Sequence, residues 1–264
     1  MERKEILYIV VPCYNEETVL PETMKRLKEK ITNLISTKKI SSKSKILFVN
    51  DGSTDNTWNI IKNISNKDKQ ITGISLSRNF GHQAAVTAGL KYTTGDAVAI
   101  MDSDLQDPPE VIEEMITLWE NGNDVIYAKR KLRKGETPFK LFTAKMFYKV
   151  LNGLSDVEIP KDTGDFRLVD RKVIDVINQM PEHNKFLRGL FSWVGYKQAA
   201  FEYERKERFA GETKYPLKKM LKLASDGIIS FSTKPLKVVI SAGIFTSAMA
   251  ILYMILIYMT LEKR

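Results

Sequence analysis

The sequence has very little of the chemistry that cysteine and histidine provide. Among 264 residues, Cys13 is the single cysteine, and His82 and His183 are the two histidines. A lone cysteine excludes a disulfide framework and a cysteine-based metal site, and two histidines argue against a histidine-rich one. Neither a disulfide-stabilised fold nor a cysteine- or histidine-rich metal centre is expected.

Two nucleotide-binding motifs are also missing. The sequence contains no G-x-x-x-x-G-K-[ST], which excludes a P-loop nucleotide triphosphatase. No G-x-G-x-x-G follows the first apolar run, which argues against a dinucleotide-dependent oxidoreductase. No internal repeat or low-complexity segment occurs. A nucleotide would therefore have to be held by side chains and a metal ion instead of a glycine-rich loop.

Charge is distributed unevenly along the chain, whose net charge is +9. Residues 1–124 contain 15 Lys and Arg against 18 Asp and Glu, a net −3. Residues 125–264 contain 26 against 14, a net +12. The C-terminal half is therefore expected to meet an anionic partner: nucleic acid, phospholipid or a phosphorylated substrate.

One long uncharged run favours a membrane among these partners, and no nucleic acid is expected. Val238–Leu261 holds 24 residues without a charge. At about 1.5 Å per residue this helix would be about 36 Å long, enough to cross a bilayer; the alternative is a buried core helix. No signal peptide is visible, since residues 1–5 are charged and the next apolar run, Ile6–Val11, is short. The rest of the chain is therefore expected on the cytoplasmic face of the cytoplasmic (inner) membrane.

Apolar runs alternate with helical patterns in the first half of the chain. The expected strands are Leu7–Val11, Lys45–Asn50, Ile71–Leu76, Ala97–Met101 and Asp124–Ala128. The expected helices are Val19–Ile35, Thr57–Ile64, His82–Tyr92 and Pro109–Glu120. This alternation predicts an α/β fold with a mostly parallel, doubly wound sheet, in which ligands bind beyond the carboxyl ends of the strands.

Polar loops follow three of these expected strands. Asp102 and Asp104 follow the fourth strand, and side chains two residues apart on a strand point the same way, so these carboxylates can converge at its end. Such oxygen ligands suit Mg²⁺ or Mn²⁺, ions that usually bridge carboxylates to substrate phosphates. The alternative is a solvated turn before a helix that begins at Pro109. The loops Pro12–Glu17 and Asn50–Ser53 are expected to border the same pocket.

The second half of the chain is less regular and rich in basic residues. Two apolar stripes at helical spacing are interleaved with lysines, and they predict either core faces or amphipathic helices lying in an anionic membrane interface. The first stripe comprises Phe139, Phe142, Met146, Phe147, Val150 and Leu151, and the second comprises Leu217, Met220, Leu221, Ala224 and Ile228. Thr163–Arg167 is expected to be a turn with an acid and a base that reaches the pocket or lies on the surface. Arg208–Tyr215 is expected to be a basic loop that clamps a phosphate or serves as a linker.

Six motifs in chain order resemble one enzyme family. They are Val11–Glu16, Asn50–Asp55, Ser77–Gly81, Asp102–Pro109, Gly164–Arg167, and Arg208 with Gly211–Lys214. These motifs span nearly the whole chain and resemble the family 2 glycosyltransferases that load sugars onto polyprenyl phosphates, such as the bactoprenol glucosyltransferases and dolichol-phosphate mannose synthase. The resemblance implies a GT-A fold, a nucleotide-sugar donor, Mg²⁺ or Mn²⁺, and inverting transfer.

The resemblance also implies roles for individual residues. The residues expected to bind the nucleoside, the donor or the phosphates are Pro12, Tyr14, Glu16, Asp51, Asp102, Ser103, Arg130, Arg208 and Lys214. Asp104 and Gln106, with Asp102 beside them, are expected to hold the metal. Asp104 and Asp165 are the catalytic candidates. A phosphate acceptor is already anionic, so Asp165 is expected to position the sugar or a basic side chain such as Arg167 instead of serving as an obligatory base.

These patterns predict residues 1–212 as a GT-A domain, residues 213–236 as an amphipathic interface segment, and residues 237–264 as a transmembrane helix with a short tail. The bactoprenol enzymes usually carry two transmembrane helices and one is visible here, so either the chain is truncated or the second is dispensable. Thr213 stands where serine is more usual, and the missing Q-x-x-R-W motif argues against a processive synthase.

The predicted function is transfer of a sugar from UDP-glucose to undecaprenyl phosphate, which supplies a lipid-linked sugar for cell-surface glycans. Other donors left open are UDP-N-acetylglucosamine, UDP-galactose and GDP-mannose. Other functions left open are a silent membrane-tethered nucleotide-sugar sensor, a basic membrane-binding module, and a transferase with a soluble or protein acceptor. Homo-oligomer formation is not readable from the sequence.

Overall fold

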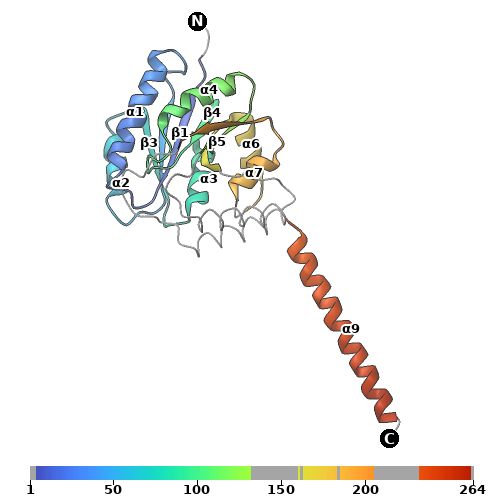
Figure 1. The fold of residues 1–264 in the computed structure, drawn as a ribbon. Helices are drawn as coiled ribbons and strands as arrows, with labels where there is room; N and C mark the ends of the chain where they lie inside the picture. Colours follow the sequence, from blue (N-terminus) through green and yellow to red (C-terminus); the bar gives the residue numbers. More distant parts are fainter. Residues whose placement is uncertain (1–3, 132–159, 161–162, 183–184, 205–231, 263–264) are drawn as a thin grey trace.

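A seven-stranded mixed sheet forms the centre of the molecule, in the strand order β3-β2-β1-β4-β6-β5-β7. This architecture comes from a computed structural model that describes residues 4–131, 160, 163–182, 185–204 and 232–262. Helices cover both faces of the sheet, as Figure 1 shows. The predicted α/β class with a doubly wound, mostly parallel sheet is therefore confirmed.

The first half of the chain builds the parallel part of the sheet. Its strands are β1 (Leu7–Cys13), β2 (Lys45–Asn50), β3 (Ile71–Ser75) and β4 (Ala97–Ile100). The helices between them are α1 (Leu20–Ser36), α2 (Thr57–Ser65) and α3 (His82–Tyr92). β1 pairs in parallel with β2 on one side and β4 on the other, so the carboxyl ends of these strands meet at one edge.

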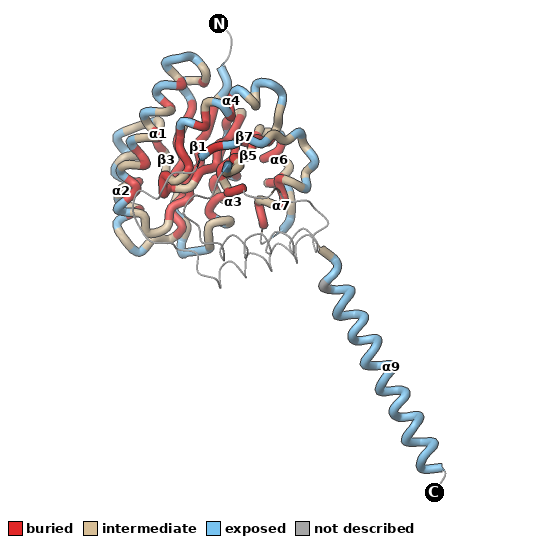
Figure 2. Tube along the Cα trace, viewed as in Figure 1, coloured by how far each residue is buried: buried red, intermediate tan, exposed pale blue. Residues whose placement is uncertain are grey.

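The two faces of the sheet receive different helices because alternate strand residues point to opposite sides. On one face, Ile9 and Val11 of β1 share a buried cluster with residues of α1, α2 and α4 (Ile112–Glu120). On the other face, Tyr8 and Val10 pack with residues of α3, α6 (Arg171–Gln179) and α7 (Leu187–Trp193). Figure 2 shows this buried interior between exposed outer surfaces.

The second half of the chain completes the sheet with one antiparallel strand. β6 (Thr163–Asp170) runs antiparallel to both β4 and β5 (Val125–Arg130), and β7 (Gln198–Tyr203) runs parallel to β5. The predicted turn at Thr163–Arg167 is therefore wrong, since these residues begin β6. Phe166 and Arg167 are buried between neighbouring strands, and this pairing overrides the turn preference of Gly164 and Asp165.

Smaller differences appear at element ends. The predicted helix Pro109–Glu120 begins as the single 3₁₀ turn η1 (Pro109–Val111), which leads into α4. Asp170 ends β6 and caps α6, because its carboxylate accepts a hydrogen bond from the Lys172 N–H at 2.9 Å. The two lysine-interleaved stripes and the loop Arg208–Tyr215 lie outside the described residues.

The final helix, α9 (Lys234–Glu262), stands apart from the domain in Figure 1. Its segment Leu236–Glu262 has a mean hydropathy of 2.1, and none of its most apolar stretch is buried within the protein. Among the described residues it is the one helix long and apolar enough to cross a membrane. A core helix of this length would be covered by protein, so the buried-helix alternative for Val238–Leu261 is wrong.

Candidate active site

Two strand-end loops are joined by reciprocal hydrogen bonds. The Asn15 N–H donates to Ser53 Oγ at 3.0 Å, and the Thr54 N–H donates to Asn15 Oδ1 at 2.9 Å. The Glu16 N–H donates to Thr57 Oγ1 at 2.9 Å. Asn15 has a φ of 53°, a conformation that asparagine tolerates better than most residues. The loops after β1 and β2 therefore form one rigid unit.

Asp51 fixes the start of α3. Its two carboxylate oxygens accept the backbone N–H groups of Phe80 and Gly81 at 2.8 and 2.9 Å. Gly52 has a φ of +63°, and a Cβ there would lie 2.3 Å from the carbonyl carbon of Arg78. The asparagine–aspartate–glycine turn after β2 thus holds the loop after β3 and determines where His82, the first residue of α3, is placed.

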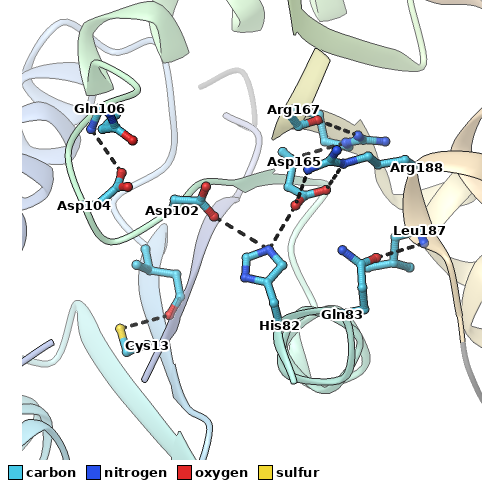
Figure 3. A network of polar contacts seen from close by, with 12 residues as sticks. Cys13, His82, Gln83, Asp102, Asp104, Gln106, Asp165, Arg167, Leu187 and Arg188 are labelled. Atoms are coloured by element: carbon cyan, nitrogen blue, oxygen red, sulfur yellow. Dashed lines mark hydrogen bonds and ion pairs between the residues drawn. The ribbon is translucent and has the colours of Figure 1, made fainter. Parts of the chain in front are cut away.

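The predicted metal loop follows β4 directly. Thr23 Oγ1 donates to the Ser103 carbonyl at 2.7 Å and ties this loop to α1. Asp104 Oδ1 accepts the Gln106 N–H at 3.1 Å, and Leu105 between them has a φ of 57°. Asp104 is buried and Asp102 is partly exposed. Figure 3 shows both carboxylates on the same side of this loop.

The pairing of β4 with β6 brings Asp165 to the metal loop. The antiparallel register pairs Ala99 with Leu168 and Ile100 with Arg167. Continued by two residues, it puts Asp102 opposite Asp165. Like charges facing each other across strands are destabilising, so a cation between them or beside them would stabilise this arrangement.

His82 and Arg188 supply the positive charge. His82 Nε2 lies 3.1 Å from Asp165 Oδ2 and 3.6 Å from Asp102 Oδ1, between the two carboxylates in Figure 3. Arg188, on α7, donates from Nε and an Nη to the two oxygens of Asp165 at 2.7 and 3.0 Å. Gln83 Oε1 accepts the Leu187 N–H at 3.0 Å, which joins α3 to α7.

The cluster shifts the pKa values of its members in opposite directions. Burial lowers the pKa of His82, but the carboxylates of Asp165 and Asp102 outweigh burial and raise it to about 9. Burial raises the pKa of Asp165, but Arg188 and His82 hold it well below its usual range. Burial raises the pKa of Asp102 to about 6, with His82 opposing the shift. His82 is therefore a cation and Asp165 an anion at neutral pH.

A second arginine supports Asp165 from within β6. Arg167 is buried and donates to the carbonyl oxygens of Gly164 and Asp165 at 3.0 and 3.3 Å. Its guanidinium carbon lies 4.6 Å from the centre of the Phe191 ring. Burial lowers the pKa of Arg167 to about 10, so it remains charged at neutral pH. The predicted partnership of Asp165 with Arg167 thus runs through backbone oxygens, and the carboxylate itself binds Arg188.

Arg130 lies at the end of β5 in a different polar group. Tyr203 Oη, at the end of β7, donates to Asp107 Oδ1. Burial lowers the pKa of Arg130, but Asp107 and Tyr203 raise it above its ordinary value. A Cβ on Gly164 would lie 3.1 Å from an Arg130 Nη. Arg130, predicted to contact a phosphate, is therefore next to the first residues of β6.

The remaining predicted binding residues divide into three groups. Pro12 is buried in β1 opposite Val49, whereas Tyr14 and Glu16 are partly exposed in the following loop. Both carboxylate oxygens of Asp51 accept backbone N–H groups. The contact of Asp51 with the nucleoside stays a prediction. Arg208 and Lys214 lie outside the described residues.

A metal ion in the loop after β4 would need ligands from the substrate as well as from the protein. Within the described ranges, no group of three or more His, Cys, Asp or Glu side chains is placed to hold a metal. Asp102 and Asp104 share one short loop, and the pKa of Asp102 is raised by its burial, with neighbouring Asp165, Asp107 and Asp104 adding to the shift. A divalent cation would relieve this negative charge, with diphosphate oxygens and water completing its coordination.

Sequence reasoning missed His82 and Arg188 as site residues. His82 directly follows the Ser77–Gly81 motif, and this adjacency was a usable signal. Arg188 follows no recognisable motif and reaches the site only because α7 packs beside α3. Gln83, which joins these two helices, carried no signal either.

Comparison with known proteins agrees with this architecture. Residues 8–177 match Glycosyl transferase family 2. The uncharacterized glycosyltransferase YkcC of Bacillus subtilis is 56% identical over 249 residues, which cover 94% of this chain and 75% of that protein. The prophage bactoprenol glucosyl transferase homolog of Escherichia coli is 42% identical over 245 residues, 93% of this chain and 78% of that protein.

Solved structures share the fold. The mannosyltransferase PcManGT of Pyrobaculum calidifontis, in complex with GDP-Man and Mn²⁺, has a TM-score of 0.52 at 16% identity over 76% of this chain and 56% of that one. Glucosyl-3-phosphoglycerate synthase of Mycobacterium tuberculosis, in complex with Mn²⁺ and UDP, has a TM-score of 0.52 at 17% identity over 84% and 75%. The fold is thus the GT-A type, and the chain belongs to glycosyl transferase family 2.

Proposed function

We propose that this glycosyltransferase moves glucose from UDP-glucose to a membrane-held polyprenyl phosphate, with inversion at the anomeric carbon. The observation that carries this proposal is the pairing of Asp165 with Arg188 and His82. Because these cations hold the pKa of Asp165 well below its usual range, its carboxylate is a weak base. A hydroxyl acceptor needs a base to take its proton, whereas a phosphate monoester is already anionic at neutral pH.

The nature of α9 supports a lipid acceptor. Its exposed apolar surface would hold the domain at a bilayer, where a polyprenyl phosphate resides. A transferase that acts on a soluble acceptor has no need of such a helix. Relatives named bactoprenol glucosyl transferase, including one of Shigella phage SfX at 42% identity, cover most of the chain. Glucose as the sugar and undecaprenyl phosphate as the acceptor are proposed by analogy with these names.

The transfer needs no proton movement. An oxygen of the acceptor phosphate attacks the anomeric carbon, the bond between this carbon and the donor's β-phosphate oxygen breaks, and UDP departs with the electron pair. Asp102 and Asp165 flank this edge of the sheet, so they can hold sugar hydroxyls on either side of the reacting carbon. A Mg²⁺ or Mn²⁺ ion held by Asp104, Gln106 and Asp102 would neutralise charge on the diphosphate.

The membrane arrangement belongs to the same proposal. We place the catalytic domain, residues 1–212, on the cytoplasmic face, where nucleotide sugars are made. Residues 213–236 would lie in the anionic interface, and Arg208 and Lys214 would meet the acceptor phosphate. The excess of positive charge in residues 125–264 supports this placement.

An acceptor series tests the proposal. The full chain in detergent, with UDP-glucose and Mg²⁺, is given undecaprenyl phosphate, undecaprenol or glycerol 3-phosphate in separate reactions. Glucosylated lipid is expected from undecaprenyl phosphate alone. Transfer to undecaprenol would show that a hydroxyl is activated and would contradict the role assigned to Asp165. Equal transfer to glycerol 3-phosphate would contradict the lipid acceptor.

A further inference from the structure

His82 has no assigned role in sugar transfer, yet it sits between the two carboxylates that the β4–β6 register brings together. Its Nε2 is 3.1 Å from Asp165 and 3.6 Å from Asp102. The side chain is 23% exposed, whereas its Nε2 atom is buried. This placement makes His82 the link between the loop after β4 and the start of β6 (Figure 3).

The backbone around His82 is held from two sides. Asp51 binds the N–H groups of Phe80 and Gly81 directly before it, and Gly81 has a φ of +99° that favours glycine. On the other side, Gln83 accepts the Leu187 N–H. Because both neighbours are fixed, the backbone of His82 has little freedom to move away from the carboxylates.

Two cationic side chains border the Asp165 carboxylate. A carboxylate offers about four acceptor positions. Arg188 occupies one on each oxygen, and His82 lies within contact distance of Oδ2. Among the residues that the structure describes, His82 and Arg188 are the cations that border this carboxylate, so together they limit the directions from which a substrate hydroxyl can approach it.

We propose that His82 is a positioning residue for sugar transfer, which holds the Asp165 carboxylate against the Asp102 loop so that both face the donor sugar. This inference rests on the proposed function, because it takes the donor sugar to lie at this edge. His82 acts through Asp165, its nearer partner, and makes no bond to the reacting carbon. Its loss therefore slows the reacting step more than it weakens binding of the nucleotide.

A double-mutant cycle tests this role in the full chain, with UDP-glucose, undecaprenyl phosphate and Mg²⁺. His82→Ala is expected to lower kcat by about 10- to 100-fold, the scale of a misplaced site group. Its KM for UDP-glucose and its affinity for UDP should stay within about threefold of the parent. His82→Gln, whose amide can still donate a hydrogen bond, should recover part of the rate. Thr87→Ala, five residues further along α3, is the matched control and should keep the parent rate.

The decisive comparison adds Asp165→Asn. If His82 acts through Asp165, the double variant His82→Ala/Asp165→Asn should be no slower than Asp165→Asn alone. A double variant whose loss is the product of the two single losses would overturn the proposal, as would a parent rate in His82→Ala or an equal loss of UDP affinity.

Melting temperatures of the parent, His82→Ala, Asp165→Asn and the double variant provide a readout that does not depend on the acceptor. Non-additive shifts are expected, since the two side chains touch; additive shifts would overturn the contact itself. If the parent chain transfers no glucose, the proposed function fails, and the melting cycle still decides whether His82 and Asp165 are coupled. If the parent is active and the cycle is additive in both readouts, the inference alone fails.

Discussion

Asp165→Asn is expected to slow sugar transfer strongly while leaving the affinity for UDP nearly unchanged. The amide keeps the size of the side chain but removes the negative charge that faces Arg188 and His82. Removing one partner of a fully buried ion pair costs about 3–5 kcal/mol. The side chains of Asp165 and Arg188 are 12% and 24% exposed, so solvent screening reduces the expected cost to about 1–3 kcal/mol.

This cost should be visible in both stability and rate. A loss of about 1–3 kcal/mol corresponds to a melting temperature lower by about 2–10 °C for a chain of this size. Transfer should fall at least ~100-fold, equivalent to about 2.7 kcal/mol of transition-state stabilisation. UDP affinity should change by less than about threefold, because the contacts of Asp165 are with Arg188 and His82, away from the loops after β1 and β2.

The assay combines calorimetry with UDP, initial rates of lipid glucosylation and thermal unfolding. Asp175→Asn is the matched control, since Asp175 is 54% exposed and pairs with Arg171 at 3.5 Å on the surface. This control should keep the parent rate and lose less than about 1 kcal/mol of stability. If Asp165→Asn transfers sugar at the parent rate, the cluster of Asp165, Arg188 and His82 has a structural role only. An equal loss of UDP binding would place Asp165 in the nucleotide site and refute the reasoning.

Three further predictions concern other parts of the chain. Asp104→Asn should slow transfer at least ~100-fold, and excess EDTA should abolish it; full activity in EDTA would exclude the metal. Hydrogen bonds from Lys30 and Lys39 lower the pKa of Glu113 to about 2 in the folded protein. The ionised Glu113 should therefore stabilise the fold above its unfolded pKa of about 4.3, and this stabilisation should be lost as the pH falls through about 2. Glu113→Gln should therefore reduce the free energy of unfolding at pH 7 by at most about 1 kcal/mol, seen as a lower melting temperature. Near pH 2 the variant and the parent should melt at the same temperature. A difference that does not change with pH would refute the pairing. The full chain should resist carbonate extraction from membranes, whereas a chain ended after Pro235 should bind only peripherally and most strongly at low salt; release of the full chain by carbonate would contradict the membrane span.

The first half of the fold could be predicted because local signals and tertiary contacts agree there. The run Leu7–Val11 is buried on both faces, and the polar turns after β1, β2 and β4 fall where the sheet needs them. The carboxyl ends of parallel strands meet at one edge, so the proximity of the three polar loops followed from the predicted parallel arrangement of the strands. Asp102 and Asp104 were found for this reason.

The antiparallel insertion could not be read from the sequence. Gly164 and Asp165 are typical turn residues, and they belong to a strand because the residues that follow them, Arg167–Val169, pair with β4 on one side and β5 on the other. Once β6 was taken for a turn, the position of Asp165 opposite Asp102 was hidden. Arg188, 23 positions after Asp165, was hidden for the same reason, because its role depends on how α7 packs.

The central claim is that the acceptor is a polyprenyl phosphate. In the most direct measurement, the full chain is incubated with Mg²⁺, undecaprenyl phosphate and one nucleotide sugar in each reaction. The four nucleotide sugars are UDP-glucose, UDP-N-acetylglucosamine, UDP-galactose and GDP-mannose. The mass of the lipid product is determined by mass spectrometry. The expected product carries one glucose per lipid phosphate, forms fastest from UDP-glucose and is cleaved by mild acid, as expected of a glycosyl phosphate. No glycolipid from any of the four donors would contradict a polyprenyl phosphate acceptor.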